Sequence, residues 1–324
     1  MVKYCIKRIL LSLLILFGVS VILYVLVRVM PDSYLYQLIN QQDPNPDEKL
    51  ALLKAQYGLD KSIIAGYLEW LGKLLQGDLG ESIVEKQPVA DVIFENMGIS
   101  FTISLISLVL QMLIAIPLGI KCACNQYGKL DYFVTALTMV GISFPSFFFG
   151  SIVIKFFAVD LKLFPDGGIV SNLPKDATDW TRFWDMAWHL VLPMLVLVIL
   201  NIGSLMRYTR TNTLEILNAD YIRTARAKGL SENKVVYKHV FRNTMIPLVT
   251  MLAGTLPGLF GGAMITEEIF GIPGIGQKAY QLLQRGDIPF IMGYNMFIAV
   301  LTVLGILLTD IMYAVVDPRV KIGK

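Results

Sequence analysis

Long apolar runs without charged residues alternate with polar segments along the chain, and these runs predict membrane-spanning helices. The first run covers residues 9–27. At about 1.5 Å per residue, a helix of this length just crosses a hydrocarbon core of about 30 Å. Five further runs of similar length cover residues 99–120, 132–154, 187–206, 246–266 and 288–309. We therefore expect an all-α membrane protein with six transmembrane helices.

The polar segments between these runs differ in charge, and the difference predicts the side of the membrane that each occupies. Four segments hold 16 Lys and Arg in 63 positions: residues 1–8, 121–131, 207–242 and 317–324. Three others hold only 10 in 117 positions: residues 30–98, 160–186 and 267–287. Cytosolic loops carry the excess of Lys and Arg, so we place the first group and both termini in the cytosol.

The first external segment is large enough to be a subdomain. It holds eleven acids against five lysines, and amphipathic patterns around residues 47–57 and 62–75 predict two helices. The predicted organisation is a cytosolic N-terminus with the first span, an external helical subdomain, a five-helix core and a cytosolic tail: residues 1–29, 30–98, 99–317 and 318–324.

Composition agrees with an integral membrane protein. The chain is 55% hydrophobic and 16% charged, with a mean hydropathy of +0.61, whereas an average soluble domain is about 25% charged. Three cysteines, Cys5, Cys122 and Cys124, fall in or beside segments that we place at the cytosolic face. Thiols stay reduced there, so a disulfide framework is not expected.

Residues 207–247 form a strongly basic segment between two membrane-length runs, with eight Lys and Arg against three acids. Its first half predicts a helix with one apolar stripe: Leu214, Leu217, Tyr221 and Ala225. Gly229 would end this helix in the left-handed conformation, and Ser231 would cap a second helix. The valines of that second helix would point back toward the membrane: Val235, Val236 and Val240. This pattern fits either a solvated loop that only joins two spans or an elbow on which a partner protein acts.

The same segment carries a family resemblance. Residues 220–230, followed by His239, Arg242-Asn243 and Ile246-Pro247, resemble the coupling segment of binding-protein-dependent ABC importers. More narrowly, they resemble the oligopeptide, dipeptide and nickel permease family. The general motif has Glu-Ala-Ala where this chain has Arg223-Thr224-Ala225, a departure shared with the peptide branch.

The resemblance extends over nearly the whole chain. Similar phrases occur in the first external region, after the third span and at the C-terminal end: Tyr57-Gly58-Leu59-Asp60, Tyr67-Leu68-Glu69-Trp70, residues 77–82, residues 163–168 and Asp317-Pro318-Arg319. After the first span the family carries Pro-Gly-Asp-Pro, whereas this chain has Pro31-Asp32-Ser33. Residues 267–276 also match, and we expect them to form a tight external re-entry, too rich in Gly and Pro for a helix.

What the resemblance implies is the architecture and role of a type I ABC importer permease. Such a subunit forms half of a translocation pathway for oligopeptides or dipeptides and works by alternating access in a bacterial or archaeal cytoplasmic membrane. Its implied partners are a homologous second permease, two cytosolic ATPase subunits, an external solute-binding protein and membrane lipid, with no nucleic acid.

Two groups of residues are the predicted functional sites. The first would couple the chain to the ATPases through a rigid helix over residues 215–228: Glu215, Asp220, Tyr221, Arg223, Ala225, Arg226 and Gly229. The second would lie at the outer mouth: Glu267, Glu268, Pro273 and Gly274.

Catalytic, cofactor and metal sites are not predicted. His189 and His239 fall on opposite sides of the membrane in this topology, and the glycines have no phosphate-loop spacing. ATP hydrolysis is therefore expected on separate subunits. The spans lack an acid or His near the midplane, which disfavours an ion-coupled carrier. A nickel or other small-solute permease, such a carrier, and a receptor or scaffold remain the alternative hypotheses.

Overall fold

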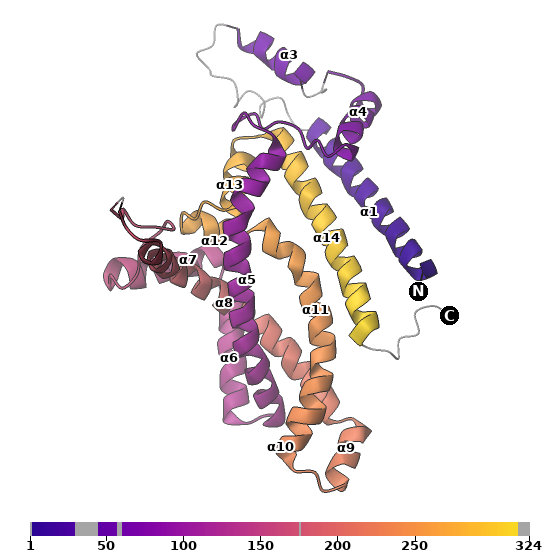
Figure 1. Ribbon diagram of the computed structural model, residues 1–324, viewed down its shortest axis with the longest axis vertical. Coiled ribbons are helices and arrows are strands. Elements are labelled where there is room, and N and C mark those ends of the chain that lie inside the picture. Colours follow the sequence, from indigo (N-terminus) through magenta and orange to yellow (C-terminus); the bar gives the residue numbers. More distant parts are fainter. Residues whose placement is uncertain (1, 30–44, 57–59, 175, 317–324) are drawn as a thin grey trace.

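The computed structural model describes residues 2–29, 45–56, 60–174 and 176–316, and this part of the chain folds as helices without a named strand. The longest helices run side by side (Figure 1): α1 (Val2–Val29), α5 (Val89–Cys124), α8 (Asp179–Leu217), α11 (Phe241–Gly261) and α14 (Ile288–Val316). Among these described residues, four helices are long and apolar enough to cross a membrane, and the number is six if each of two bent helix pairs is counted as one span.

Shorter helices complete the described chain. They are α3 (Pro46–Gln56), α4 (Ile63–Leu75), α6 (Lys129–Ser143), α7 (Ser146–Val153), the π-helix η1 (Ile154–Asp160), α9 (Asp220–Ala227), α10 (Glu232–Lys234), the π-helix η2 (Val235–Val240), α12 (Met264–Ile269) and α13 (Ile275–Gln284). The Pro31-Asp32-Ser33 and Asp317-Pro318-Arg319 phrases, residues 57–59 and the tail 318–324 lie outside the described residues.

The third span, which was predicted over residues 132–154, is broken into two helices, α6 and α7. α6 ends at Ser143, and the pair of helices is bent by 103° at the break. Phe144 is extended, with φ −79° and ψ 131°, because the ring of Pro145 disfavours helical geometry at the residue before it. As a result α7 extends sideways from the bundle (Figure 1).

Other helix boundaries also differ from the predicted spans. α5 begins at Val89, well before residue 99, because Val89, Val92 and Ile93 are fully buried against α13 and α14. The fifth span stops at Gly261, since Gly262 adopts a left-handed φ of +74° and the chain restarts as α12. Residues 264–266 therefore belong to a separate helix.

Small residues and one ion pair bring the core helices together. A Cβ added at Gly119 of α5 would lie 2.8 Å from Cβ of Thr209 on α8, so only glycine permits this approach. Arg210 of α8 holds buried Asp131 of α6 through two hydrogen bonds of 2.6 Å each. These contacts fix α5, α6 and α8 at the end of the bundle from which α9 and α10 project.

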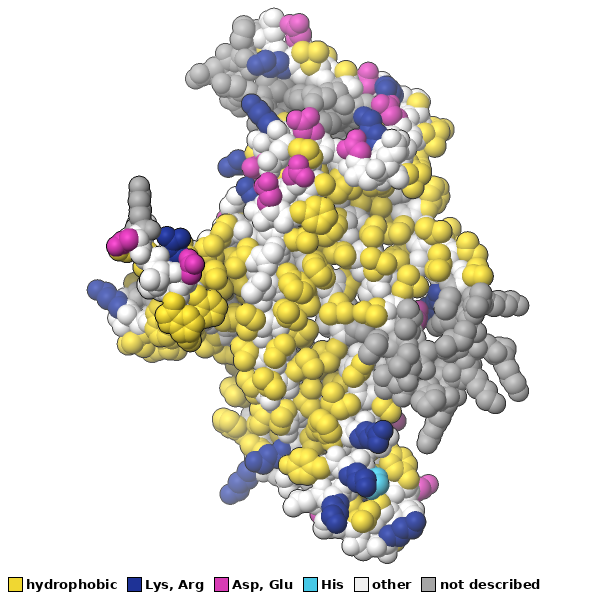
Figure 2. Space-filling model, in the orientation of Figure 1, with side chains coloured by type: hydrophobic (Ala, Val, Ile, Leu, Met, Phe, Trp, Pro, Cys, Tyr) yellow, Lys and Arg dark blue, Asp and Glu magenta, His cyan; other side chains and the backbone are white. Residues whose placement is uncertain are grey.

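Side chains are segregated along the long axis of the molecule. Figure 2 shows a broad belt of hydrophobic side chains across the middle. Acidic and basic side chains mix over α3 and α4 at one end, whereas Lys and Arg predominate around α9 and α10 at the other (Figure 2). An apolar belt between two charged ends is the pattern expected of a chain that crosses a membrane.

Candidate functional site

The basic segment folds as a helical elbow at one end of the bundle. α8 runs out to Leu217, α9 follows after a turn, and η2 leads back into α11 (Figure 1). Gly229 lies between α9 and α10 with a φ of +77°, which confirms the predicted left-handed glycine. A residue with Cβ is disfavoured at this φ, so glycine sets the angle between the two helices.

The elbow has its own small core. Four residues from α9 and η2 are buried together: Ile222, Ala225, Val235 and Val240. Ile216 and Leu217, at the end of α8, pack against this cluster. Val235 and Val240 therefore pack on α9, whereas Val236 is half-buried and stays outside this cluster. The elbow is a packed unit because its apolar stripe is covered from within the segment.

The predicted apolar stripe was wrong at Tyr221, and the predicted helix over residues 215–228 is interrupted. Ala219 is extended, with φ −71° and ψ 146°, and α9 restarts after it. This break shifts the helical register, so Ile222 is fully buried and Tyr221 is 50% exposed. Ala225 keeps its predicted buried place.

A bidentate ion pair between Arg226 and Glu232 spans the turn at Gly229. Arg226 of α9 donates from Nε to Oε2 of Glu232 at 3.1 Å and from Nη2 to Oε1 at 2.6 Å. These hydrogen bonds raise the pKa of Arg226 above its ordinary value, so the guanidinium stays charged. Glu232 was not predicted from the sequence as a site residue. An acid at the N-terminus of the second predicted helix was the pattern that could have indicated it.

The other predicted coupling residues face outward. Glu215, Asp220, Tyr221 and Arg223 are all exposed. Arg223 and Asp220 lie 3.7 Å apart between Nη1 and Oδ1, on successive turns of α9. Ser231 occupies the N-cap position of α10, but its side chain makes no capping hydrogen bond. The outer face of α9 thus offers charged and aromatic groups that the elbow core does not use.

The elbow is tied to the bundle through buried hydroxyl and charged groups. Thr213 of α8 and Thr244 of α11 are fully buried, and their hydroxyl oxygens lie 3.4 Å apart. Asp131, which holds Arg210, also accepts a hydrogen bond of 3.0 Å from the backbone N–H of Tyr127. Movement of the elbow is therefore expected to reach α6, α8 and α11 together.

At the opposite end, the predicted outer mouth is a packed turn centred on Glu267. This side chain is 2% exposed, and its carboxylate accepts hydrogen bonds from the backbone N–H of Ala263 at 2.8 Å and of Gln277 at 3.1 Å. A Cβ on Gly274 would collide with this carboxylate. Glu267 therefore joins the start of α12 to the start of α13.

The expected non-helical re-entry over residues 267–276 is only partly present. Residues 267–269 complete α12, and Ile275 already begins α13, so the irregular part is the short turn between them. Glu268 is half-buried and accepts a 3.4 Å hydrogen bond from Gln281, while Pro273 is exposed. The helices extend further than predicted because Thr266, Glu267 and Ile275 are buried.

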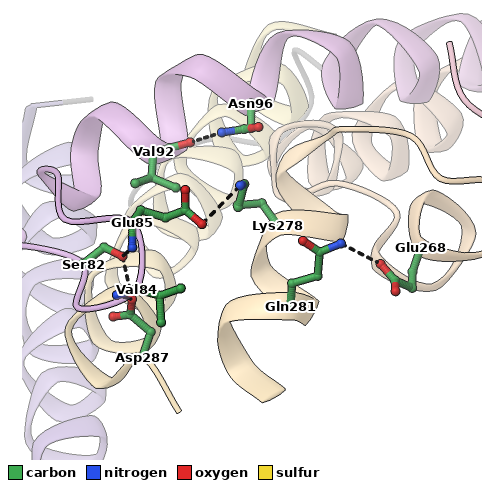
Figure 3. Close-up of polar contacts among 9 residues, drawn as sticks. All are labelled: Ser82, Val84, Glu85, Val92, Asn96, Glu268, Lys278, Gln281 and Asp287. Atoms are coloured by element: carbon green, nitrogen blue, oxygen red, sulfur yellow. Dashed lines mark hydrogen bonds and ion pairs between the residues drawn. The ribbon is translucent and has the colours of Figure 1, made fainter. Parts of the chain in front are cut away.

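A second buried carboxylate connects this region to residues 78–88, which we call the outer hairpin. Asp287 is fully buried and accepts hydrogen bonds from Ser82 Oγ at 2.5 Å, from Val84 N–H at 3.0 Å and from Phe290 N–H at 3.1 Å. Lys278 of α13 lies 3.3 Å from Glu85 of the outer hairpin (Figure 3). Asp287 was not predicted from the sequence as a site residue. Its position just before a long apolar helix is typical of a residue that caps the helix N-terminus.

The chain is similar in sequence to membrane components of transport systems. The family model described as "Binding-protein-dependent transport system inner membrane component" matches residues 115–322, and the model of the N-terminal part of such membrane components matches residues 1–106. The oligopeptide transport system permease protein AppB of Bacillus subtilis is 38% identical over 99% of this chain and 100% of its own length. The dipeptide transport system permease proteins DppB of B. subtilis and Lactococcus lactis are 33% and 34% identical, with at least 99% of each chain covered.

Proposed function

Since this chain belongs to the family of inner membrane components of binding-protein-dependent transport systems, we propose that its elbow passes the movement of partner ATPases to the membrane helices. The chain is a permease subunit of a peptide importer, and as a transport subunit it is not itself an enzyme. The family implies a solute-binding protein and ATPase partners. We infer two ATPases and a homologous second permease, so that this chain forms half of the pathway.

The single observation that supports the coupling role is the construction of the elbow. Its inner face is a closed apolar core, whereas its outer face leaves Asp220, Tyr221 and Arg223 exposed. A helix that is packed on one side and exposed on the other suits docking by a partner. Because α8 and α11 carry the elbow directly, displacement of α9 would move both helices and change access to the pathway.

The predicted coupling residues divide into two roles under this proposal. Asp220, Tyr221 and Arg223, with Glu215 on the adjoining turn of α8, would contact an ATPase. Ala225 and Gly229 would maintain the elbow, the first by burial and the second by its left-handed backbone. Arg226 would brace the elbow rather than contact a partner, because its guanidinium is held by Glu232.

The same proposal assigns an orientation. We infer that the elbow and both termini lie in the cytosol and that α3, α4 and the outer hairpin lie outside the cytoplasmic membrane, as the distribution of Lys and Arg favours. The outer mouth residues Glu267, Glu268, Pro273 and Gly274 would then shape the external end of the pathway. Residues 30–98 would form the external subdomain and residues 99–317 the core.

Charge reversal on the outer face of α9 tests the coupling role. Arg223→Glu should reduce recovery of ATPase subunits with the affinity-tagged chain by about tenfold, because like charges at an interface cost free energy. Recovery of the second permease should not change. Lys129→Glu is the matched control, since it makes the same charge change at an exposed position outside the elbow. Equal recovery of ATPases with both variants would refute the docking role of this face.

A further inference from the structure

A cleft of about 460 Å³ opens beside the outer hairpin, away from the elbow. Its walls come from α1, α4, the outer hairpin and the first turns of α14. Tyr24 and Trp70 provide aromatic surface, and Pro289 and Met292 provide apolar surface. A cleft of this volume with a few polar groups has the size of a small-molecule site.

Tyr24 brings an unsatisfied hydroxyl group to this cleft. The residue is 3% exposed, and its Oη has no hydrogen-bond partner among the described residues. Its ring packs against Tyr67 and Trp70, with centroids 5.6 and 5.9 Å away. By contrast, Oη of Tyr67 lies 2.9 Å from Oγ of Ser20. Buried polar atoms are nearly always paired in folded proteins, so the orphaned Oη indicates that something else completes this site.

The rim of the cleft is acidic. It carries Glu69, Asp78 and Glu81 against a single lysine, Lys73. Glu69 is already held by Lys61 at 2.5 Å and by Lys73 at 3.9 Å. Two carboxylates at the rim, those of Asp78 and Glu81, therefore remain without an ion pair among the described residues.

We propose that this cleft binds a cationic group of a peptide, either an ammonium or a guanidinium. A cation gains from carboxylates at the rim and from the face of an aromatic ring, and Tyr24 Oη can accept a hydrogen bond from it. An anionic group, such as a lipid phosphate, would be repelled by the same carboxylates. The proposal shares with the proposed function only the peptide as ligand, because the cleft lies outside the elbow.

Trp70 supplies a direct readout of the cleft. The chain has four tryptophans, and the other three, Trp180, Trp184 and Trp188, lie on the first turns of α8. The full chain carrying Trp180→Phe, Trp184→Phe and Trp188→Phe, reconstituted in nanodiscs, would keep Trp70 as its single tryptophan. Titration with N-acetyl-L-argininamide, whose only charge is its guanidinium, should change Trp70 fluorescence saturably. N-acetyl-L-citrullinamide, which has nearly the same shape without the charge, should bind at least about tenfold more weakly.

Calorimetric titration of the unsubstituted chain makes the test independent of those three substitutions. Tyr24→Phe, which removes only the hydroxyl, and Glu81→Gln, which removes only a charge, should each weaken binding of N-acetyl-L-argininamide by about three- to tenfold. Glu95→Gln is the control, because this exposed acid of α5 does not line the cleft. Absence of saturable binding, equal binding of the neutral analogue, or unchanged affinity in both cleft variants would overturn the proposal. None of these results would alter the test of Arg223.

Discussion

Buried carboxylates hold together segments that are distant in the sequence or separated by turns. Asp131 joins α6 to α8, Glu267 joins the start of α12 to the start of α13, and Asp287 joins the outer hairpin to α14. Each accepts hydrogen bonds from a guanidinium, a hydroxyl or backbone N–H groups, which offset the cost of removing a charge from water. These three residues therefore stabilise both ends of the bundle, one of which carries the elbow.

Glu267→Gln tests this view at a single residue. The carboxylate accepts N–H groups through both of its oxygens, whereas a glutamine amide turns one acceptor into a donor that faces another donor. We expect a loss of about 1–3 kcal/mol in stability, measured by thermal unfolding of the purified chain in detergent. Glu268→Gln, next to it and held by one hydrogen bond of 3.4 Å, should change stability by less than about 0.5 kcal/mol. Equal effects at both positions would contradict the assigned role of Glu267.

For single residues, the sequence predicts local backbone features better than contacts between residues that are distant in the chain. A lone glycine between two short amphipathic stretches was sufficient to predict the left-handed turn at Gly229. The Asp131 to Arg210 pair was not predictable, because its partners come together only after α6 has packed on α8. Likewise, Glu267 was recognised by its motif, but its burial depends on backbone N–H groups of two separate segments.

The apolar pattern predicts where the long helices lie, but it does not predict where they end or break. Mean hydropathy finds each apolar run, but it does not report backbone conformation. Pro145 breaks the third span because it constrains Phe144, and Gly262 ends α11 because it adopts positive φ. In the elbow, the extended Ala219 changes the register, so Ile222 replaces Tyr221 on the buried face.

The ion pair between Arg226 and Glu232 leads to a prediction for the local stability of α9 and α10. Arg226→Gln removes both hydrogen bonds to Glu232, and for this exposed pair we expect a local loss of about 1 kcal/mol or less. Backbone amides over residues 220–234 should therefore exchange hydrogen for deuterium severalfold faster, measured by mass spectrometry. Arg223→Gln is the control, because its contact with Asp220 is a single one at 3.7 Å. Similar exchange rates in the two variants would show that the ion pair between Arg226 and Glu232 does not stabilise the elbow.

The whole molecule places two charged ends on either side of an apolar belt (Figure 2). The sequence predicted this plan, the all-α class and six spans, because hydropathy and Lys/Arg counts are properties of segments. It did not anticipate that α4 would pack on α1 and α14 through Tyr24, Tyr67, Trp70 and Met292. Those contacts join residues far apart in the chain, and no local pattern encodes them.

The proposed orientation can be checked by labelling. In a chain with Cys5, Cys122 and Cys124 replaced by alanine, Gln76→Cys and Lys228→Cys each introduce one thiol at an exposed position, at opposite ends of the molecule. A membrane-impermeant maleimide added to intact cells should label the variant at position 76 strongly and the variant at 228 only after permeabilisation. The reverse pattern would place the elbow outside and contradict its coupling to cytosolic ATPases.

If the geometry of the elbow couples ATP hydrolysis to peptide import, a change at Gly229 should alter transport by the assembled importer in proteoliposomes. Gly229→Val places a β-branched residue at a φ of +77° with no neighbouring atom within 4 Å of the new Cβ, so its effect comes from the backbone. We expect ATP-dependent peptide uptake to fall by about tenfold or more, whereas Gly229→Asn, which tolerates this conformation, should retain most of it. Unaltered uptake in the valine variant, or uptake driven by an ion gradient without ATP, would show that the elbow does not couple ATP hydrolysis to import.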